Sequence, residues 1–332
     1  MKSNIKSRLK KITSLVIAVI TALSMIAGCD VQQKDDGVLN ILCTVFPVYD
    51  WVCEITKGAE NVEVELLVES GADMHSYQAT ASDLVKLASC DIFVYVGGIS
   101  DVWVEDALES APSENRTVLS LMALLPDDRK ICADAGHAEE YGHEESHGHT
   151  EKEAYDEHLW LSINNAKILC ENISGKLAEI DSVNSEKYAE NTASYCEKLK
   201  KLDGEYKTAI GDASPKMLIF GGRFPFVYLL NDYGLLHYAA FEGCSAESEA
   251  SFETVVFLAE KVDELGVPAV MTVKGDSDAI AKTVVENTKN KNQQILVIDS
   301  MQSVTRKDIE GGATYFDIMK SNLDAIKIAL DY

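Results

Sequence analysis

Short apolar runs alternate with amphipathic stretches along most of the chain, which predicts repeated strand–helix units. The predicted strands form two sets of four: 39–45, 62–68, 91–96 and 117–119, then 216–220, 236–241, 268–273 and 294–298. Helical patterns accompany them at 48–57, 82–88, 101–108, 254–265, 278–287 and 314–330. Strands that alternate with helices in this way form parallel sheets. We therefore predict an α/β fold with two lobes, each containing a roughly four-stranded parallel sheet flanked by helices.

One long helix is predicted between the two sets of strands, from Ser185 to Ile210. Its apolar residues recur at helical spacing and share one face: Tyr188, Tyr195, Leu199, Leu202, Tyr206 and Ala209. Asn184 or Ser182 can cap its start, and Gly211 can end it in a left-handed conformation. About 25 residues span ~38 Å at a rise of 1.5 Å per residue. We expect residues 182–213 to link an N-terminal lobe (38–181) rigidly to a C-terminal lobe (214–332); the alternative is a surface helix of one lobe.

The N-terminus has the pattern of a secretory leader. Five basic residues precede a short apolar run at 15–23, which is shorter than the roughly 20 residues that a membrane span requires. The following Ile26-Ala27-Gly28-Cys29 resembles a bacterial lipobox. This predicts that residues 1–28 are removed, that Cys29 carries lipid and that residues 29–37 form a tether. The protein is then expected on the outer face of the cell membrane; the alternative is an ordinary cleavage site beside an unmodified cysteine.

The chain is strongly acidic, with 54 Asp and Glu against 30 Lys and Arg and a net charge of −24. Such a surface repels phosphate, so nucleic acid is excluded as a partner, and it attracts metal cations. Seven of the eight cysteines follow Cys29, and no two have C-x-x-C spacing. We expect buried thiols rather than a disulfide framework.

Four of the seven histidines lie within residues 136–150, a segment that also contains four glutamates and almost no apolar residue. They are His137, His143, His147 and His149. Imidazole and carboxylate groups suit Zn²⁺, and a segment of this composition cannot form a core. We interpret it as a loop that captures metal weakly; the alternative is a solvated acidic loop.

Single residues near strand ends are further candidates for metal binding. His75 lies in the loop after strand 62–68, and Asp299 directly follows strand 294–298. Ligands of open parallel sheets bind beyond the carboxyl ends of the strands. His158 stands at the start of a helical pattern, whereas His237, inside a predicted strand, is more typical of a structural histidine.

Five segments, in order along the chain, resemble the metal-binding lipoproteins of ABC importers, the cluster A-I substrate-binding proteins for zinc, manganese and iron. They are residues 71–80 with 83–84, 91–96 and Trp103; 157–161 (EHLWL); 226–228 with 232–235; 245–251; and 299–300 with Tyr315, Met319 and 322–323. The His-rich insert before His158 is typical of the zinc-specific branch. The resemblance covers essentially the whole chain after the leader.

The resemblance implies one metal ion between the lobes, with His75 and His158 as first-lobe ligands and Asp299 as a second-lobe ligand. It implies Zn(II) as cargo, with Mn(II) as second choice, for delivery to a membrane permease that a separate ATPase subunit drives. We expect a monomer and no enzymatic activity. The alternatives are a manganese or iron receptor, a surface adhesin or metal-dependent interaction lipoprotein, and a metallohydrolase. The last is disfavoured because G-x-S-x-G is missing from the sequence, and the one H-E-x-x-H spacing, at residues 143–147, falls in the low-complexity His-rich segment, a poor place for a precise catalyst.

The chain departs from the family pattern at the third ligand, where Arg223 stands in place of histidine or glutamate. A guanidinium has no lone pair to donate to a metal. Arg223 then pairs with Glu247, Glu249 or Asp299 beside a three-ligand site completed by water or another carboxylate. Alternatively it holds an anion next to the metal, or this chain no longer binds a bare ion in the usual way.

Overall fold

The computed structural model describes residues 37–69, 71, 74–133, 155–211, 213–241, 243 and 250–330. Several residues singled out in the sequence lie outside the described residues: Cys29, Glu247, Glu249 and the histidines of the predicted capture loop, His137, His143, His147 and His149. Residues 37–332 form one compact unit that contains both sheets described below.

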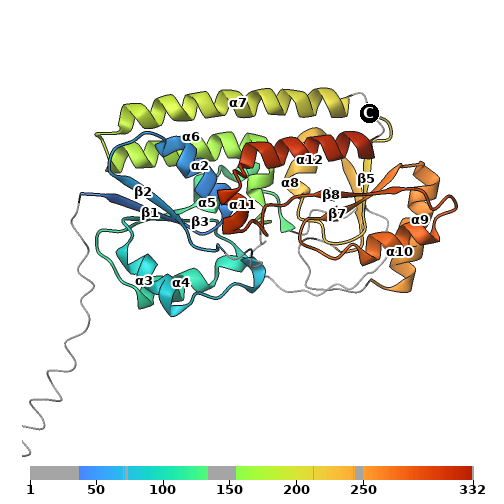
Figure 1. Ribbon diagram of the computed structural model, residues 1–332, viewed down its shortest axis with the longest axis horizontal. Coiled ribbons are helices and arrows are strands. Elements are labelled where there is room, and N and C mark those ends of the chain that lie inside the picture. The colour runs from blue at the N-terminus through green and yellow to red at the C-terminus, as the bar shows by residue number, and fades with distance from the viewer. Residues whose placement is uncertain are drawn as a thin grey trace, which may run out of the picture. The chain divides into compact units, whose positions relative to one another are not determined.

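Two parallel four-stranded sheets form the centre of the described structure (Figure 1). The first has the order β2-β1-β3-β4, with β1 (Leu39–Cys43), β2 (Val62–Leu66), β3 (Ile92–Tyr95) and β4 (Thr117–Ser120). The second has the order β6-β5-β7-β8, with β5 (Met217–Phe220), β6 (Leu236–Ala239), β7 (Ala269–Val273) and β8 (Gln294–Ile298). Every pairing between these strands is parallel. The predicted fold class is confirmed, and we call the two sheets with their helices the first and second lobes.

Four of the predicted strands extend beyond the last residues that pair in the sheet. The chain leaves the sheet before Val45, Val68, Val96 and Phe241, although all four residues are buried. Their apolar side chains belong to the core beneath the strand ends, and the hydrophobic pattern therefore continues where the strand hydrogen bonds have stopped.

The described helices cover both faces of each sheet. They are α2 (Phe46–Thr56), α3 (Ala81–Ser89), α4 (Trp103–Ser110), α5 (Leu121–Leu124), α6 (Ile163–Ile180), α7 (Ser185–Gly211), α8 (Val227–Tyr233), α9 (Phe252–Leu265), α10 (Ala279–Asn287), α11 (Arg306–Glu310) and α12 (Tyr315–Ala329), with short 3₁₀ turns η2 (Met74–Ser76), η3 (Ile99–Asp101), η4 (Asp127–Arg129) and η6 (Leu159–Leu161). The α5, α8 and α11 helices are not among those predicted from the sequence, whereas α6 corresponds to the helical pattern that His158 precedes. No helix in the described ranges is long and apolar enough to cross a membrane.

Alternation along the strands decides which helices each face receives, because successive strand residues point to opposite faces. Leu42 and Phe93 pack in the cluster that contains residues of α3 and α4, whereas Ile41 and Ile92 pack in the cluster of α2 and α6. In the second lobe, α9 and α10 pack against one face of the sheet, around Ile219. Figure 1 shows the same arrangement, with α3 and α4 on the opposite side of the first sheet from α2 and α6.

The long helix α7 has the apolar face predicted for it. Tyr188, Leu199, Leu202 and Tyr206 are fully buried, and Tyr195 and Ala209 nearly so. Gly211 is the last residue of α7, but it has no positive φ, so the predicted left-handed conformation is wrong. The chain turns only after this residue, where the Ala213 N–H donates to the Ile210 carbonyl.

Hydrogen bonds tie α7 to both lobes. Near its start, Asn191 donates to the Ile55 and Lys57 carbonyls of the first lobe. Near its end, the Tyr206 hydroxyl donates to the Met319 carbonyl of α12 at 2.6 Å. The α12 helix packs along the second sheet and also contacts α2 of the first lobe, so it forms a second connection beside α7.

The described cysteines agree with the expectation of unpaired thiols. Six are free and three of these are buried; the free cysteines are Cys43, Cys53, Cys90, Cys132, Cys170 and Cys196. Cys244 lies outside the described residues.

One carboxylate is buried where the lobes meet. Asp50 of α2 is 8% exposed and accepts a hydrogen bond from the Tyr315 N–H, at the start of α12, over 3.0 Å. Burial raises the pKa of Asp50 from 3.8 to about 7, even though the hydrogen bond from Tyr315 opposes the shift. Asp50 therefore retains a proton in the folded chain at pH values where the unfolded chain has lost it.

Because of this difference in pKa, Asp50 should make the free energy of unfolding depend on pH. Because the native state binds the extra proton between pH 4 and 7, the free energy of unfolding falls as the pH rises through this range. Asp50→Asn removes this pH dependence. The free energy of unfolding of the variant, minus that of wild type, should therefore rise by about 2 kcal/mol between pH 5 and pH 8, measured by urea unfolding. Asp324→Asn, at an exposed position of α12, is the control and should show a constant difference. A constant difference for Asp50→Asn would contradict the assignment.

Candidate metal centre

His75 and His158 lie side by side in the first lobe, with ring centroids 5.3 Å apart. His75 is the central residue of η2, which Met74 anchors in the core at 4% exposure. His158 directly precedes η6, whose three residues are fully buried. Each histidine thus follows or precedes an apolar anchor that fixes where its ring lies.

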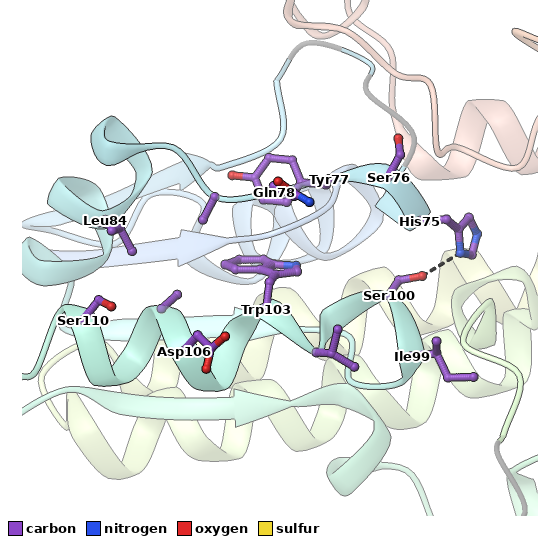
Figure 2. A pocket seen from close by; sticks show the side chains of 13 residues that line it. His75, Ser76, Tyr77, Gln78, Leu84, Ile99, Ser100, Trp103, Asp106 and Ser110 are labelled. Carbon is purple, nitrogen blue, oxygen red and sulfur yellow. Dashed lines mark hydrogen bonds between the residues drawn. The ribbon is translucent and has the colours of Figure 1, made fainter.

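The Nδ1 atom of each histidine faces a carboxylate. His75 Nδ1 lies 3.1 Å from Glu157 Oε1 and 2.6 Å from the Ser100 hydroxyl oxygen, the contact drawn in Figure 2. His158 Nδ1 lies 3.0 Å from Asp156 Oδ1. A carboxylate accepts from Nδ1–H, so this arrangement places the lone pair of the neutral ring on Nε2. Histidines that bind metal are held in this way by a carboxylate on their second nitrogen.

Glu157 is held from several sides. Its Oε2 accepts from the Ser100 N–H at 2.9 Å, and its Oε1 accepts from the Ser100 hydroxyl. Burial alone would raise the pKa of Glu157, but the hydrogen bonds from His75 and Ser100 outweigh it and lower the pKa below its ordinary value. Glu157 therefore remains an ionised acceptor for His75.

Gly98 makes room for Glu157. Its φ of +127° lies in a region that residues with a side chain rarely adopt, and a Cβ atom there would lie 2.8 Å from Glu157 Oε2. The turn that presents Ser100 to His75 thus depends on a glycine at this position.

Asp299 belongs to the second lobe and directly follows β8. Its backbone is held by Asn322 of α12, which accepts from the Asp299 N–H and donates to the Asp299 carbonyl, each at 2.8 Å. Its Oδ1 accepts from the Met301 N–H at 2.7 Å, and its Oδ2 lies 3.0 Å from Lys274 Nζ. The side chain predicted to be a ligand therefore has a partner on each oxygen.

The loops that carry these residues meet between the lobes. The Trp160 indole, whose ring centroid is 5.4 Å from that of His158, donates to the Ser300 carbonyl at 2.9 Å. Gly71, in the loop before His75, has a φ of +65°, and a Cβ there would lie 3.0 Å from the Ser303 carbonyl oxygen. Even so, the described residues contain no group of three His, Cys, Asp or Glu side chains arranged to hold a metal. The structure thus brings His75 and His158 together but does not gather Asp299 with them.

Arg223 pairs with Asp276, which is not among the partners predicted from the sequence. Its Nε donates to Asp276 Oδ2 at 2.9 Å, and its Nη2 contacts Oδ1. Asp276 and Lys274 follow β7. Ligands of parallel sheets bind beyond the carboxyl ends of the strands, and this reasoning, which indicates Asp299, could also have indicated these two residues.

His237 lies in β6 and stacks on Phe224, with ring centroids 3.5 Å apart. Burial lowers its pKa to about 4, so the ring is neutral. Its place inside the second lobe agrees with a structural role.

Two cavities adjoin these residues. One of about 640 Å³ lies in the first lobe beside His75, with Tyr77 and Trp103 packed edge to face across it (Figure 2). A smaller one of about 110 Å³ is lined by residues of both lobes, among them Gly71, Arg223 and Lys274.

Residues 41–329 match the family model described as zinc-uptake complex component A periplasmic, ZnuA. The chain belongs to the ZnuA family. This confirms the family predicted from the sequence.

Alignments with two related proteins cover most of this chain. It is 31% identical to the zinc-binding lipoprotein AdcA of Streptococcus pneumoniae strain R6 over 97% of its own length, but it spans only 62% of AdcA. It is 30% identical to the high-affinity zinc uptake system protein ZnuA of Bacillus subtilis over 88% of each chain. The crystal structure of the Zn(II)-bound ZnuA-like domain of S. pneumoniae AdcA superposes with a TM-score of 0.69 and 27% identity, covering 89% of this chain and all of that domain.

Gly98→Ala should disturb the support of His75. The added methyl group meets Glu157 Oε2 and the backbone is strained, so we expect a loss of about 1–3 kcal/mol in the free energy of unfolding, measured with urea. Gly175→Ala is the matched control, because Gly175 lies inside α6 with open space around its Cβ position. The control should instead gain about 0.5–1 kcal/mol. Equal changes in the two variants would show that Gly98 is an ordinary surface glycine.

Proposed function

We propose that this ZnuA-family chain binds Zn²⁺ between its lobes through His75, His158 and Asp299 and delivers it to an ABC importer permease. The observation that carries the proposal is the pair of neighbouring histidines, each with a carboxylate on Nδ1. The names of the relatives support zinc as the cargo, since AdcA is called zinc-binding and the B. subtilis protein belongs to a zinc uptake system.

The chemistry of the three side chains suits zinc. Two neutral imidazoles and one carboxylate are ligands that Zn²⁺ accepts in a four-coordinate site, with the fourth position left for water or another carboxylate. Mn²⁺ is the second choice, because it prefers a larger share of oxygen ligands. Arg223 cannot fill the fourth position, and its pairing with Asp276 removes much of its repulsion for the ion.

The same proposal includes the surroundings of the protein. The leader at residues 1–28 and a lipid on Cys29 would anchor the chain on the outer face of the cell membrane, and the name of AdcA as a lipoprotein supports this. The chain would act as a monomer beside a permease and its separate ATPase subunit. The histidines of residues 136–150 would capture zinc weakly before it reaches the inter-lobe site. Membership of a family of uptake components argues against a metallohydrolase.

Removal of any one proposed ligand should weaken the tight zinc site. We expect His75→Ala, His158→Ala and Asp299→Asn each to lower zinc affinity at least about tenfold, because each removes a direct ligand, measured by competition titration with a chromophoric chelator. His237→Phe is the control; it removes a histidine outside the site but keeps a ring on Phe224, so the affinity should stay unchanged.

Deletion of residues 136–150 separates the two kinds of site. The tight site should remain, and only weaker zinc binding should be lost. Wild-type affinity in both histidine variants, or loss of the tight site with the loop, would reject the assignment of His75 and His158.

Glu157→Gln tests the support of His75 separately. The amide is close in shape but offers a neutral and weaker acceptor to Nδ1, so we expect zinc affinity to fall about tenfold. Glu179→Gln, at an exposed position of α6, is the control. If Glu157→Gln bound zinc like wild type, Glu157 would have no part in orienting the metal ligand.

A further inference from the structure

The carboxylate proposed to bind zinc from the second lobe is already engaged by a cation of the chain itself. Lys274 follows β7 and Asp299 follows β8, and these two strands are neighbours in the sheet. The Lys274 N–H donates to the Ile298 carbonyl at 2.9 Å, which fixes the lysine backbone next to Asp299. The side chains then meet, with Nζ and Oδ2 3.0 Å apart.

The cavity at this position adds a second cation. Of about 110 Å³, it is lined by Gly71 from the first lobe and by Arg223, Lys274, Asp276 and Ser300 from the second. Arg223 is held against Asp276 by two contacts in a fork arrangement, so its guanidinium is fixed in place. The two basic side chains that line this cavity, Arg223 and Lys274, are each paired with an aspartate, Asp276 and Asp299.

Lys274 differs from Arg223 in its freedom to move. Its side chain is 42% exposed, whereas that of Arg223 is 24% exposed. An ammonium on a flexible four-carbon stem can turn into water without leaving a buried charge behind. Asp299, with its side chain 12% exposed and its backbone held by Asn322, stays in place when the lysine leaves.

We propose that Lys274 is a tethered competitor for the cargo: its ammonium occupies Asp299 in the metal-free chain, yields to a divalent cation on binding and returns to Asp299 as the metal leaves. This inference rests on the proposed metal site. It assigns to Lys274 a role in setting zinc affinity and release, because the metal must displace one cation to gain the carboxylate. On release, the returning lysine neutralises Asp299 and lowers the free energy of the empty site.

The test compares variants that remove or keep the charge. Lys274→Gln should bind Zn²⁺ up to about fivefold more tightly than wild type, in a competition titration of the full chain, because an ion pair of this exposure contributes up to about that factor. Zinc dissociation into excess chelator should slow in the same variant. Lys274→Arg keeps the charge and should not tighten binding. Lys282→Gln, which breaks a similar lysine–aspartate pair on α10, should bind like wild type.

A double variant shows whether Lys274 acts through Asp299. In an Asp299→Asn background, Lys274→Gln should leave zinc affinity unchanged, because the shared carboxylate is gone. Unchanged or weaker binding by Lys274→Gln alone, or equal tightening with and without Asp299, overturns the inference. If Asp299→Asn itself binds zinc like wild type, the proposed site fails; if that variant weakens binding while Lys274→Gln does not tighten it, only the role of Lys274 fails.

Discussion

The two lobes are joined at Trp160, and the geometry of the candidate site depends on that contact. Its side chain is fully buried, its indole N–H donates to the Ser300 carbonyl, and its own carbonyl accepts from the Tyr315 hydroxyl. A buried indole N–H without a partner costs about 1–3 kcal/mol, so the contact with Ser300 forms part of the folded state. Trp160 stands two residues after His158 and Ser300 one residue after Asp299. The bond that satisfies the indole therefore also fixes the distance between the two loops.

Around this contact the two halves of the site are prepared differently. In the first lobe, Ser100 and Glu157 hold His75, and Asp156 holds His158, so the rings are set before any ligand arrives. In the second lobe, Asp299 has its backbone held but shares its Oδ2 with Lys274. Binding would thus begin on a preorganised pair and finish by exchange of one ion pair. Because α7 and α12 connect both lobes, such an exchange of side-chain partners suits release better than a wide hinge motion.

The sequence allows some residues of the candidate site to be predicted from pattern, but not all of them. His75 and Asp299 follow strands, and the rule for parallel sheets indicates both from pattern alone. His158 follows no strand, and only the family resemblance indicates it. The pairing of Lys274 with Asp299 depends on β7 and β8 being neighbours, and strand order does not follow from hydrophobic periodicity.

Local backbone geometry limits prediction in a second way. Ser100 reaches His75 from 25 residues away because the chain turns at Gly97 and Gly98, both with positive φ. Two adjacent glycines indicate a turn, but they do not show which side chain the turn will meet. The end of α7 illustrates the same limit, since the glycine at its last position does not adopt the left-handed conformation that it could. Tertiary packing thus decides which backbone conformation a glycine adopts and which side chains it brings together.

Charge alone cannot explain selection among metal ions. A net charge of −24 attracts every cation to the surface, including Ca²⁺ and Mg²⁺, which bind through oxygen ligands. At the proposed site, however, Asp299 is shared with Lys274 and Asp276 is held by Arg223, so the second lobe offers little oxygen that is not already paired with a cation of the chain. A hard ion gains little there, and it gains nothing comparable from two imidazoles. An ion that accepts nitrogen ligands is also bound by both imidazole rings, whereas Lys274 and Arg223 are paired with the carboxylates. These two basic residues therefore weaken the binding of every cation, but they weaken the binding of Zn²⁺ less than that of an ion that depends on oxygen ligands.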